Sequence, residues 1–333
     1  MKDLINFDDP VYILFGWEAK EARPNCDPFT GSLRIHTDTY QVWTTGVHLK
    51  HHIRRVLEVP GEQYMKGKAH FATFYSKYDD EGNPVSFNRR LDKIAEEFGF
   101  KKHDGRAAVD YCLDLPLFGF VNAYKNPKAS KAKDTQKSEA EVETFNLCNA
   151  ANTLFDPVTF HACEIKYIGT NNAFPTEDKS GEVNTSAGSS TRDRLEYGLF
   201  LGLIEVNLPT LASNTRHHKF LPWSDGNNAA KWIDVLASAQ WAAYTTHRFS
   251  SQTQRNQFAK LQVIWQPKQA EVSEYAYPKD LINLLGVNKT VTSWPEAKKA
   301  LNATVLPYLL DSYKLTKDNI LGATLAEGIV LPV

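Results

Sequence analysis

Residues 44–59 read TTGVHLKHHIRRVLEV, and this spacing predicts an amphipathic helix. The apolar positions recur at helical intervals and suit a core-facing stripe: Leu49, Ile53, Val56 and Leu57. The basic positions fall on the opposite side of the helix: Lys50, His51, Arg54 and Arg55. Thr44 or Thr45 can cap the first turn, and Pro60 cannot continue the helix.

Strand-like segments surround this helix. VYILF at residues 11–15 is almost entirely apolar, as expected for a strand covered on both faces. Later come strand-like residues 158–168, the strand LEYGLFLGLIEVN (195–207), the helix NNAAKWIDVLASAQWAAY (227–244) and the strand AKLQVIWQ (259–266). This order predicts an α+β fold of RRM or ferredoxin-like type, an antiparallel sheet with two helices on one face, interrupted by two insertions.

Composition narrows the class of protein. The chain has 333 residues and a net charge of -1, so a polyanion partner must bind a local basic groove. No apolar run is long enough for a membrane span, and the first residues, MKDLINFDDP, do not resemble a signal peptide. We therefore expect a cytoplasmic protein without a membrane partner. The four cysteines form no CxxC pair, so no metal site or other cofactor is expected.

Three features carry candidate nucleic-acid chemistry, and each has a plainer alternative. The basic helix face can follow a phosphate backbone or can be an ordinary solvated surface. The loop around Asn25 and Asp27 can offer backbone N–H groups to an anion, or it can be an Asx-turn. Some aromatic residues can stack on bases or belong to the core: Tyr40, Trp43, Phe71, Phe74 and Tyr75.

Signals for catalysis are weak. The sequence contains His161 near Cys163, the pair His217–His218, and His247, but no nucleophile elbow, HExxH or P-loop accompanies them. Asp27 and Asp38 can in principle hold a metal ion, or they are turn carboxylates. His51 and His52 can act as acid and base on a ribose hydroxyl, but no partner group is specified. We expect a protein that is not an enzyme.

Several segments resemble one family in the same order along the chain. ARPNCDP stands where that family has an Asn-Pro-Asn-Gly-Asp-Pro-like loop, with Cys26 in place of the glycine. TTGVHLKHHIRR matches its basic helix, with His51 in place of an arginine, and DLPLFG matches an Asp-x-Arg-Leu-Phe-Gly-like segment without the arginine. EYGLFLGLIEVN and WIDVLASAQWAAYTTHR complete the series. The chain thus resembles the backbone subunits of CRISPR Cascade complexes, the Cas-seven group of the RAMP superfamily, most of all the type I-B and I-C branch.

The resemblance implies a division of the chain around an RRM-like palm. Residues 1–60, 107–168 and 195–266 would form the palm, with a polar loop at 125–143. Residues 61–106 would be a finger-like insertion, 169–194 a thumb-like insertion, and 267–333 a C-terminal helical extension.

The resemblance also implies a function. Copies of the chain would polymerise on one guide RNA (crRNA), assemble with other Cascade subunits, and leave guide bases free to pair with target DNA. The residues implied in RNA binding are Asn25, Asp27, Lys50, His51, Arg54, Arg55, Arg192 and Arg194. The alternative function is a RAMP-type ribonuclease that acts on guide precursor or target RNA, with Asp27, Asp38 or His51 as its candidate residues.

Overall fold

The computed structural model describes residues 5–57, 73–74, 85–123, 144–171, 176–177, 183–184, 189–223, 226–245, 256–268 and 290–331. Several predicted features lie outside these ranges: the polar loop 125–143, Phe71, Tyr75 and His247. Among the described residues, none of the helices combines the length and the apolar character needed to cross a bilayer.

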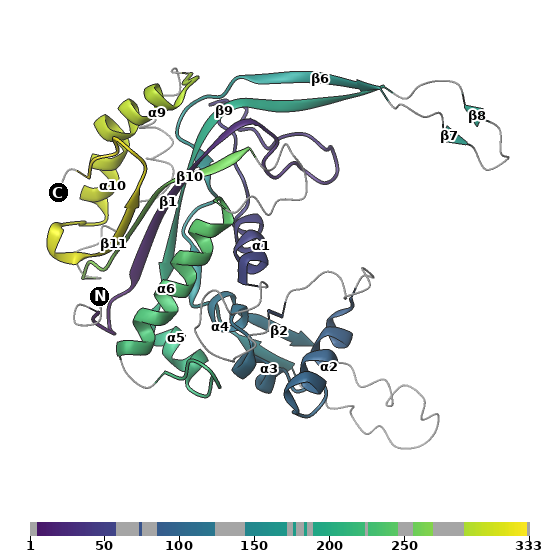
Figure 1. Ribbon diagram of the computed structural model, residues 1–333, viewed down its shortest axis with the longest axis vertical. Helices are drawn as coiled ribbons and strands as arrows, with labels where there is room; N and C mark the ends of the chain where they lie inside the picture. Colours follow the sequence, from purple (N-terminus) through teal and green to yellow (C-terminus); the bar gives the residue numbers. More distant parts are fainter. Residues whose placement is uncertain are drawn as a thin grey trace.

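Three long antiparallel strands form the centre of the main sheet (Figure 1). Strand β1 (Val11–Ala22) lies between β9 (Ser189–Val206) and β10 (Gln257–Trp265) and pairs with both. Strand β1 is longer than its predicted apolar run. It continues as far as Ala22 through residues 18–22, where buried and exposed positions are mixed.

Shorter strands complete the two edges of this seven-stranded sheet. Strand β11 (Ile320–Leu325) pairs with β10, and β4 (Ala151–Thr153), β5 (Val158–Thr159) and β6 (Ile165–Asn171) pair with β9. If the last three are counted as one interrupted strand and β11 as an addition, the order is that of a ferredoxin-like sheet. The predicted α+β fold of RRM type is therefore confirmed.

Helices α1 (Gly46–Leu57) and α6 (Gly226–Ala243) cover one face of the sheet, as predicted. The predicted apolar stripe of α1 is buried as expected: Leu49, Ile53, Val56 and Leu57. Beneath the helices, the Trp17 ring stacks on Tyr244 with ring centroids 4.3 Å apart. Phe15 lies over Gly202 on the neighbouring strand, where a Cβ atom would come within 2.4 Å of the ring.

A second helical layer covers the other face of the sheet (Figure 1, yellow). It consists of α9 (Trp294–Ala300), the π-helical η5 (Leu301–Val305) and α10 (Leu306–Ser312). Because side chains alternate along a strand, Tyr12 and Leu14 of β1 pack against this layer while their neighbours pack against α1 and α6. Coverage of both faces explains the apolar run at 11–15.

The C-terminal extension is not purely helical, which corrects the prediction. After the short 3₁₀ turn η6 (Lys317–Asn319), the chain returns to the sheet as strand β11. Strand β11 pairs with the backbone N–H and C=O groups of β10, which would otherwise form an unpaired edge of the sheet.

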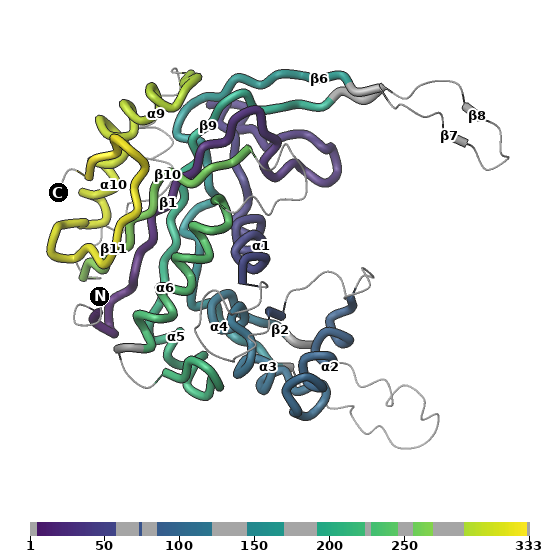
Figure 2. The backbone as a smooth tube through the Cα atoms, viewed as in Figure 1, coloured from purple at the N-terminus to yellow at the C-terminus, as the bar shows by residue number. Residues whose placement is uncertain are grey.

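A smaller unit with its own apolar cluster lies beside α1 (Figure 2). It contains α2 (Phe87–Phe98), α3 (Gly105–Tyr111), α4 (Asp114–Phe118), β2 (Phe120–Ala123) and β3 (Thr144–Leu147). Helix α2 ends at Gly99, which adopts the left-handed conformation with φ of 73°. Between α3 and β2 the chain forms the five-residue helix α4.

Strands β6 and β9 continue past the sheet as a two-stranded projection (Figures 1 and 2). Strand β9 begins at Ser189 rather than at residue 195, so it includes Arg192 and Arg194, which the sequence placed in an irregular insertion. Beyond the projection lies a small pair of strands, β7 (Thr176–Glu177) and β8 (Val183–Asn184), and β9 is followed by helix α5 (Leu208–Thr215).

Candidate nucleic-acid interface

The structure divides the predicted basic face of α1 into residues with different environments. Arg55 is exposed. The Arg54 side chain is only 13% exposed, its Nε lies 3.4 Å from Oδ2 of Asp114, and its guanidinium covers the Phe118 ring at 4.9 Å. Asp114 is fully buried and also accepts a hydrogen bond from the backbone N–H of Phe74 (2.8 Å). Arg54 therefore connects α1 to α4 inside the protein.

Lys50 lies next to Arg54 and is half-buried. Its Nζ is 5.7 Å from the centroid of the Phe118 ring. Burial, followed by the nearby charge of Arg54, lowers the pKa of Lys50. Lys50 is thus a partly covered cation that shares the Phe118 ring with Arg54.

The histidines of α1 have distinct roles. Nε2 of His48 and Nε2 of His52 are 2.8 Å apart, which is a hydrogen-bond distance between side chains one helical turn apart. Burial lowers the pKa of both residues, that of His48 to about 4, so both are neutral at pH 7. His51 is half-buried on the side of Lys50. His48 and His52 therefore contribute no charge to the basic face at pH 7.

The loop after β1 reaches the N-terminus of α1 through Asn25. Asn25 Nδ2 donates to Thr45 Oγ1 (3.1 Å), and Thr45 Oγ1 accepts from the backbone N–H of His48 (3.1 Å). Thr45, one of the two predicted caps, thus caps α1. The positive φ of the loop, 46°, lies at Asn25 and not at Cys26, so a cysteine is tolerated where the family pattern has glycine.

Asp27 organises its own loop. Its Oδ1 accepts from the N–H groups of Phe29 (2.9 Å) and Thr30 (3.1 Å), and its Oδ2 lies 3.3 Å from Arg34. These backbone hydrogen bonds, that of Thr30 first, lower the pKa of Asp27. Of the two interpretations of this loop, the Asx-turn is correct at Asp27.

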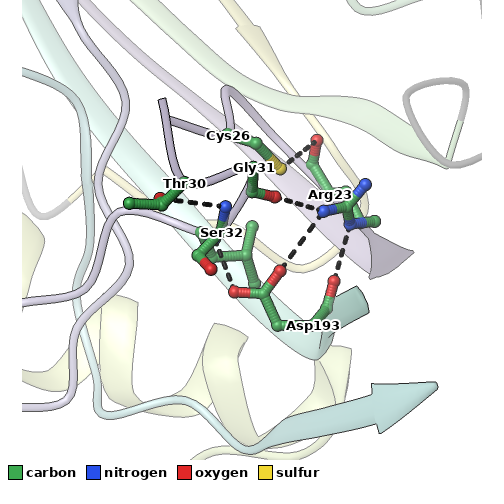
Figure 3. A network of polar contacts seen from close by, with 7 residues as sticks. Arg23, Cys26, Thr30, Gly31, Ser32 and Asp193 are labelled. Atoms are coloured by element: carbon green, nitrogen blue, oxygen red, sulfur yellow. Dashed lines mark hydrogen bonds and ion pairs between the residues drawn. The ribbon is translucent and has the colours of Figure 1, made fainter. Parts of the chain in front are cut away.

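The same loop also contacts the root of the β6–β9 projection through Arg23 and Asp193 (Figure 3). Arg23 Nε donates to the Asp193 carbonyl (2.7 Å), and its NH2 group lies 3.3 Å from Asp193 Oδ1 and donates to the carbonyl of Gly31. Asp193 Oδ2 accepts from the N–H of Leu33 (2.6 Å). Sequence reasoning singled out neither residue, because they lie 170 positions apart and no local pattern links Arg23 to Asp193.

The two predicted arginines of the projection differ in exposure. Arg192 is exposed, and it forms no ion pair within the described ranges. Arg194 is a quarter exposed, with NH2 3.2 Å from Glu196 and NH1 3.7 Å from Glu21. Arg192 is therefore the arginine whose charge faces outward.

The candidate aromatic residues separate into core and surface. Phe74 is buried in the smaller apolar cluster, whereas Tyr40 is exposed. Trp43 is half-buried, with the Arg34 guanidinium 5.2 Å above its ring and His36 stacked on it. Phe29, at the tip of the Asp27 turn, is 95% exposed, and the sequence analysis did not single it out.

The residues considered for catalysis do not converge. Burial lowers the pKa of His161 to about 4 and raises that of Cys163 to about 11, so neither group is charged near pH 7. His218 Nδ1 accepts from the N–H of Leu221 (3.0 Å), and Asp38 is exposed. The part of the chain that the structure describes holds no group of three His, Cys, Asp or Glu residues suited to a metal ion.

Comparison with known proteins was made at three levels. No protein-family model matches the chain, and no curated protein sequence matches it. Among solved structures, a chain of a "CRISPR RNA-guided surveillance complex, pre-nicking" is 14% identical, with a TM-score of 0.51, over 91% of this chain and 89% of that one. A chain of a "CRISPR RNA-guided surveillance complex" is also 14% identical, with a TM-score of 0.45, over 91% of this chain and 84% of that one. The first comparison shows a shared fold.

Proposed function

We propose that this chain is a guide-RNA-binding, filament-forming backbone subunit of a type I CRISPR surveillance complex, most similar to the type I-B and I-C branch. The observation that carries the proposal is the shared fold with a chain of such a complex over nearly the whole of both chains. The ordered series of sequence motifs supports the same family independently of that comparison.

We place the RNA strand along a path from α1 to the β6–β9 projection. Arg55 and Lys50 lie on α1, and Arg192 lies on the projection. The loop that carries Asn25 and Asp27 contacts both elements, at Thr45 and at Asp193. Cations at the two ends of such a path bind phosphates and contribute affinity without reading sequence.

The partners of the proposed subunit are crRNA, further copies of the same chain, other Cascade subunits and, through guide pairing, target DNA. The subunit holds the sugar–phosphate backbone, and base pairing supplies sequence recognition. The subunit itself is proposed to be non-catalytic, because Asp27 uses its carboxylate oxygens within its own turn and His52 pairs with His48.

The test uses charge reversal at exposed residues. Arg55→Glu combined with Arg192→Glu should abolish co-purification of RNA when the protein is expressed with a CRISPR repeat array. The absorbance ratio at 260 and 280 nm falls, and the particle size falls to that of single subunits. Arg54 is excluded from the variant because it pairs with the buried Asp114, so its loss would affect folding as well as binding.

The matched control reverses two exposed lysines, Lys299→Glu on α9 and Lys317→Glu in the η6 turn, both outside α1 and the projection. This control should retain RNA and particle size. Retention of RNA by the Arg55/Arg192 variant at physiological salt would refute the proposal. Incubation of labelled guide precursor with and without magnesium tests the ribonuclease alternative: specific cleavage that is lost in Asp27→Ala would contradict the non-catalytic assignment.

A further inference from the structure

The root of the β6–β9 projection is attached to the loop after β1 by a buried charged pair. Asp193 is 6% exposed, and both its carboxylate and its backbone carbonyl accept hydrogen bonds from that loop. Arg23 supplies the opposite charge and also donates to the carbonyl of Gly31 (Figure 3). Hydrogen bonds between ionised groups are shorter and more directional than neutral ones, so this contact fixes orientation as well as distance.

Strand geometry connects this attachment to the outward-facing cation. Successive side chains on a strand point to opposite faces, so Arg192 and Arg194 project from one face while Asp193 projects from the other. Asp193 also lies directly across from Tyr167 of β6, whose ring is 75% exposed. Any rotation of the strand at position 193 therefore displaces Arg192.

The loop extends the connection to α1. Two residues after Arg23, the chain turns at Asn25, whose side chain donates a hydrogen bond to Thr45 at the helix cap. Backbone segments and short polar contacts connect Arg192 to α1, by way of Asp193, Arg23 and Asn25. Among the three residues that link Arg192 to the helix, only Arg23 has a long, flexible side chain. These contacts therefore fix the distance between Arg192 on the projection and the basic residues of α1.

We infer that Arg23 and Asp193 are positioning residues that place Arg192 of the projection relative to the basic residues of α1. The inference rests on the proposed function, because it assigns these residues a role in RNA binding that neither performs by touching RNA. Asp193 is buried and negative, so it cannot itself bind a phosphate group. Asp193 affects RNA affinity only by fixing the position of Arg192.

A double-mutant cycle distinguishes positioning from a general structural role. The variants are Asp193→Asn, Arg192→Gln and their combination, all in the full chain, and the probe is a fluorescein-labelled mixed-sequence single-stranded RNA. Loss of one charge-assisted contact should weaken binding about tenfold in Arg192→Gln. Asp193→Asn should weaken binding several-fold alone and cause no further loss when Arg192 is already changed.

The control places Asp193→Asn in a Lys317→Gln background, where its full effect should persist because Lys317 lies in the η6 turn, outside α1 and the projection. Arg23→Gln is a second probe of the pair, in case Asp193→Asn does not fold, and it should show the same dependence on Arg192. Circular dichroism and urea unfolding identify variants that are folded.

The outcomes separate the two proposals. If Arg192→Gln weakens binding but Asp193→Asn and Arg23→Gln bind as the unchanged protein does, the positioning role is wrong and the proposed function stands. If the effects of Asp193→Asn and Arg192→Gln multiply, Asp193 does not act through Arg192, and the inference also fails. If the unchanged protein binds no RNA in the assay or on expression with a repeat array, the proposed function is wrong and the inference falls with it.

Discussion

The ion pair between Arg54 and Asp114 predicts that a residue of the basic helix face contributes mainly to folding. Replacing Arg54 with methionine keeps most of the side-chain volume over Phe118 but removes the positive charge 3.4 Å from a fully buried carboxylate. Removal of one partner of a buried pair usually costs about 3 to 5 kcal/mol, because the other charge stays buried and loses that partner.

The structure places the expected cost at the lower end of that range. Asp114 keeps its hydrogen bond from the N–H of Phe74, and the Arg54 side chain is 13% exposed, so some solvent reaches the pair. We expect Arg54→Met to lower the free energy of unfolding by about 3 kcal/mol. Asp114→Asn in the same chain should restore about 2 kcal/mol, because asparagine still accepts from Phe74 and carries no charge.

Urea unfolding followed by circular dichroism measures these changes. Arg55→Met is the matched control, because Arg55 is the adjacent exposed arginine, and its effect should stay within about 0.5 kcal/mol. The reasoning is refuted if Arg54→Met is as stable as Arg55→Met, or if adding Asp114→Asn makes Arg54→Met less stable. The first outcome would mean that Arg54 is a surface cation like its neighbour.

Three further predictions concern stability and binding. Burial lowers the pKa of His48 to about 4 in the folded protein. As the pH falls below about 6.5, the unfolded chain therefore binds a proton at His48 before the folded protein does, and the free energy of unfolding decreases until the pH reaches about 4. In urea unfolding, the stability lost between about pH 7 and about pH 4.5 should be smaller by about 2 kcal/mol in His48→Gln; an equal loss in both proteins would contradict the assignment. Gly202→Ala should cost about 2 kcal/mol of unfolding free energy, because the new Cβ meets the buried Phe15 ring, whereas Gly169→Ala, with no atom within 4 Å of its Cβ, should cost far less; equal effects would show that the ring moves freely. Arg55→Gln should reduce the slope of log affinity for RNA against log salt concentration by about 0.7, and an unchanged slope would exclude a phosphate contact at Arg55.

The sequence was sufficient for the elements whose signals are local. The buried apolar stripe of α1 follows from helical periodicity. The all-apolar start of β1 correctly indicated cover on both faces, although it did not show that α9 and α10 supply the second cover.

The candidate site was harder to predict because its decisive contacts are non-local. The spacing on α1 placed Lys50, Arg54 and Arg55 together, but it could not show that Asp114, on a five-residue helix with no periodicity of its own, pairs with one of them. Asp193 lies between two arginines in a polar stretch, so its burial against Arg23 had no signal in the sequence. The proposed roles of the RNA-binding residues remain predictions.

The second helical layer, formed by α9, η5 and α10, determines whether the face of the sheet beneath it can contact RNA bases. RRM domains recognise RNA on the open face of their sheet, where aromatic side chains of the central strands stack on individual nucleotides. Here that face is sealed: Tyr12 and Tyr197 pack beneath the layer formed by α9, η5 and α10. The aromatic side chains that the central strands place on that face therefore belong to the core and are not available to stack on bases.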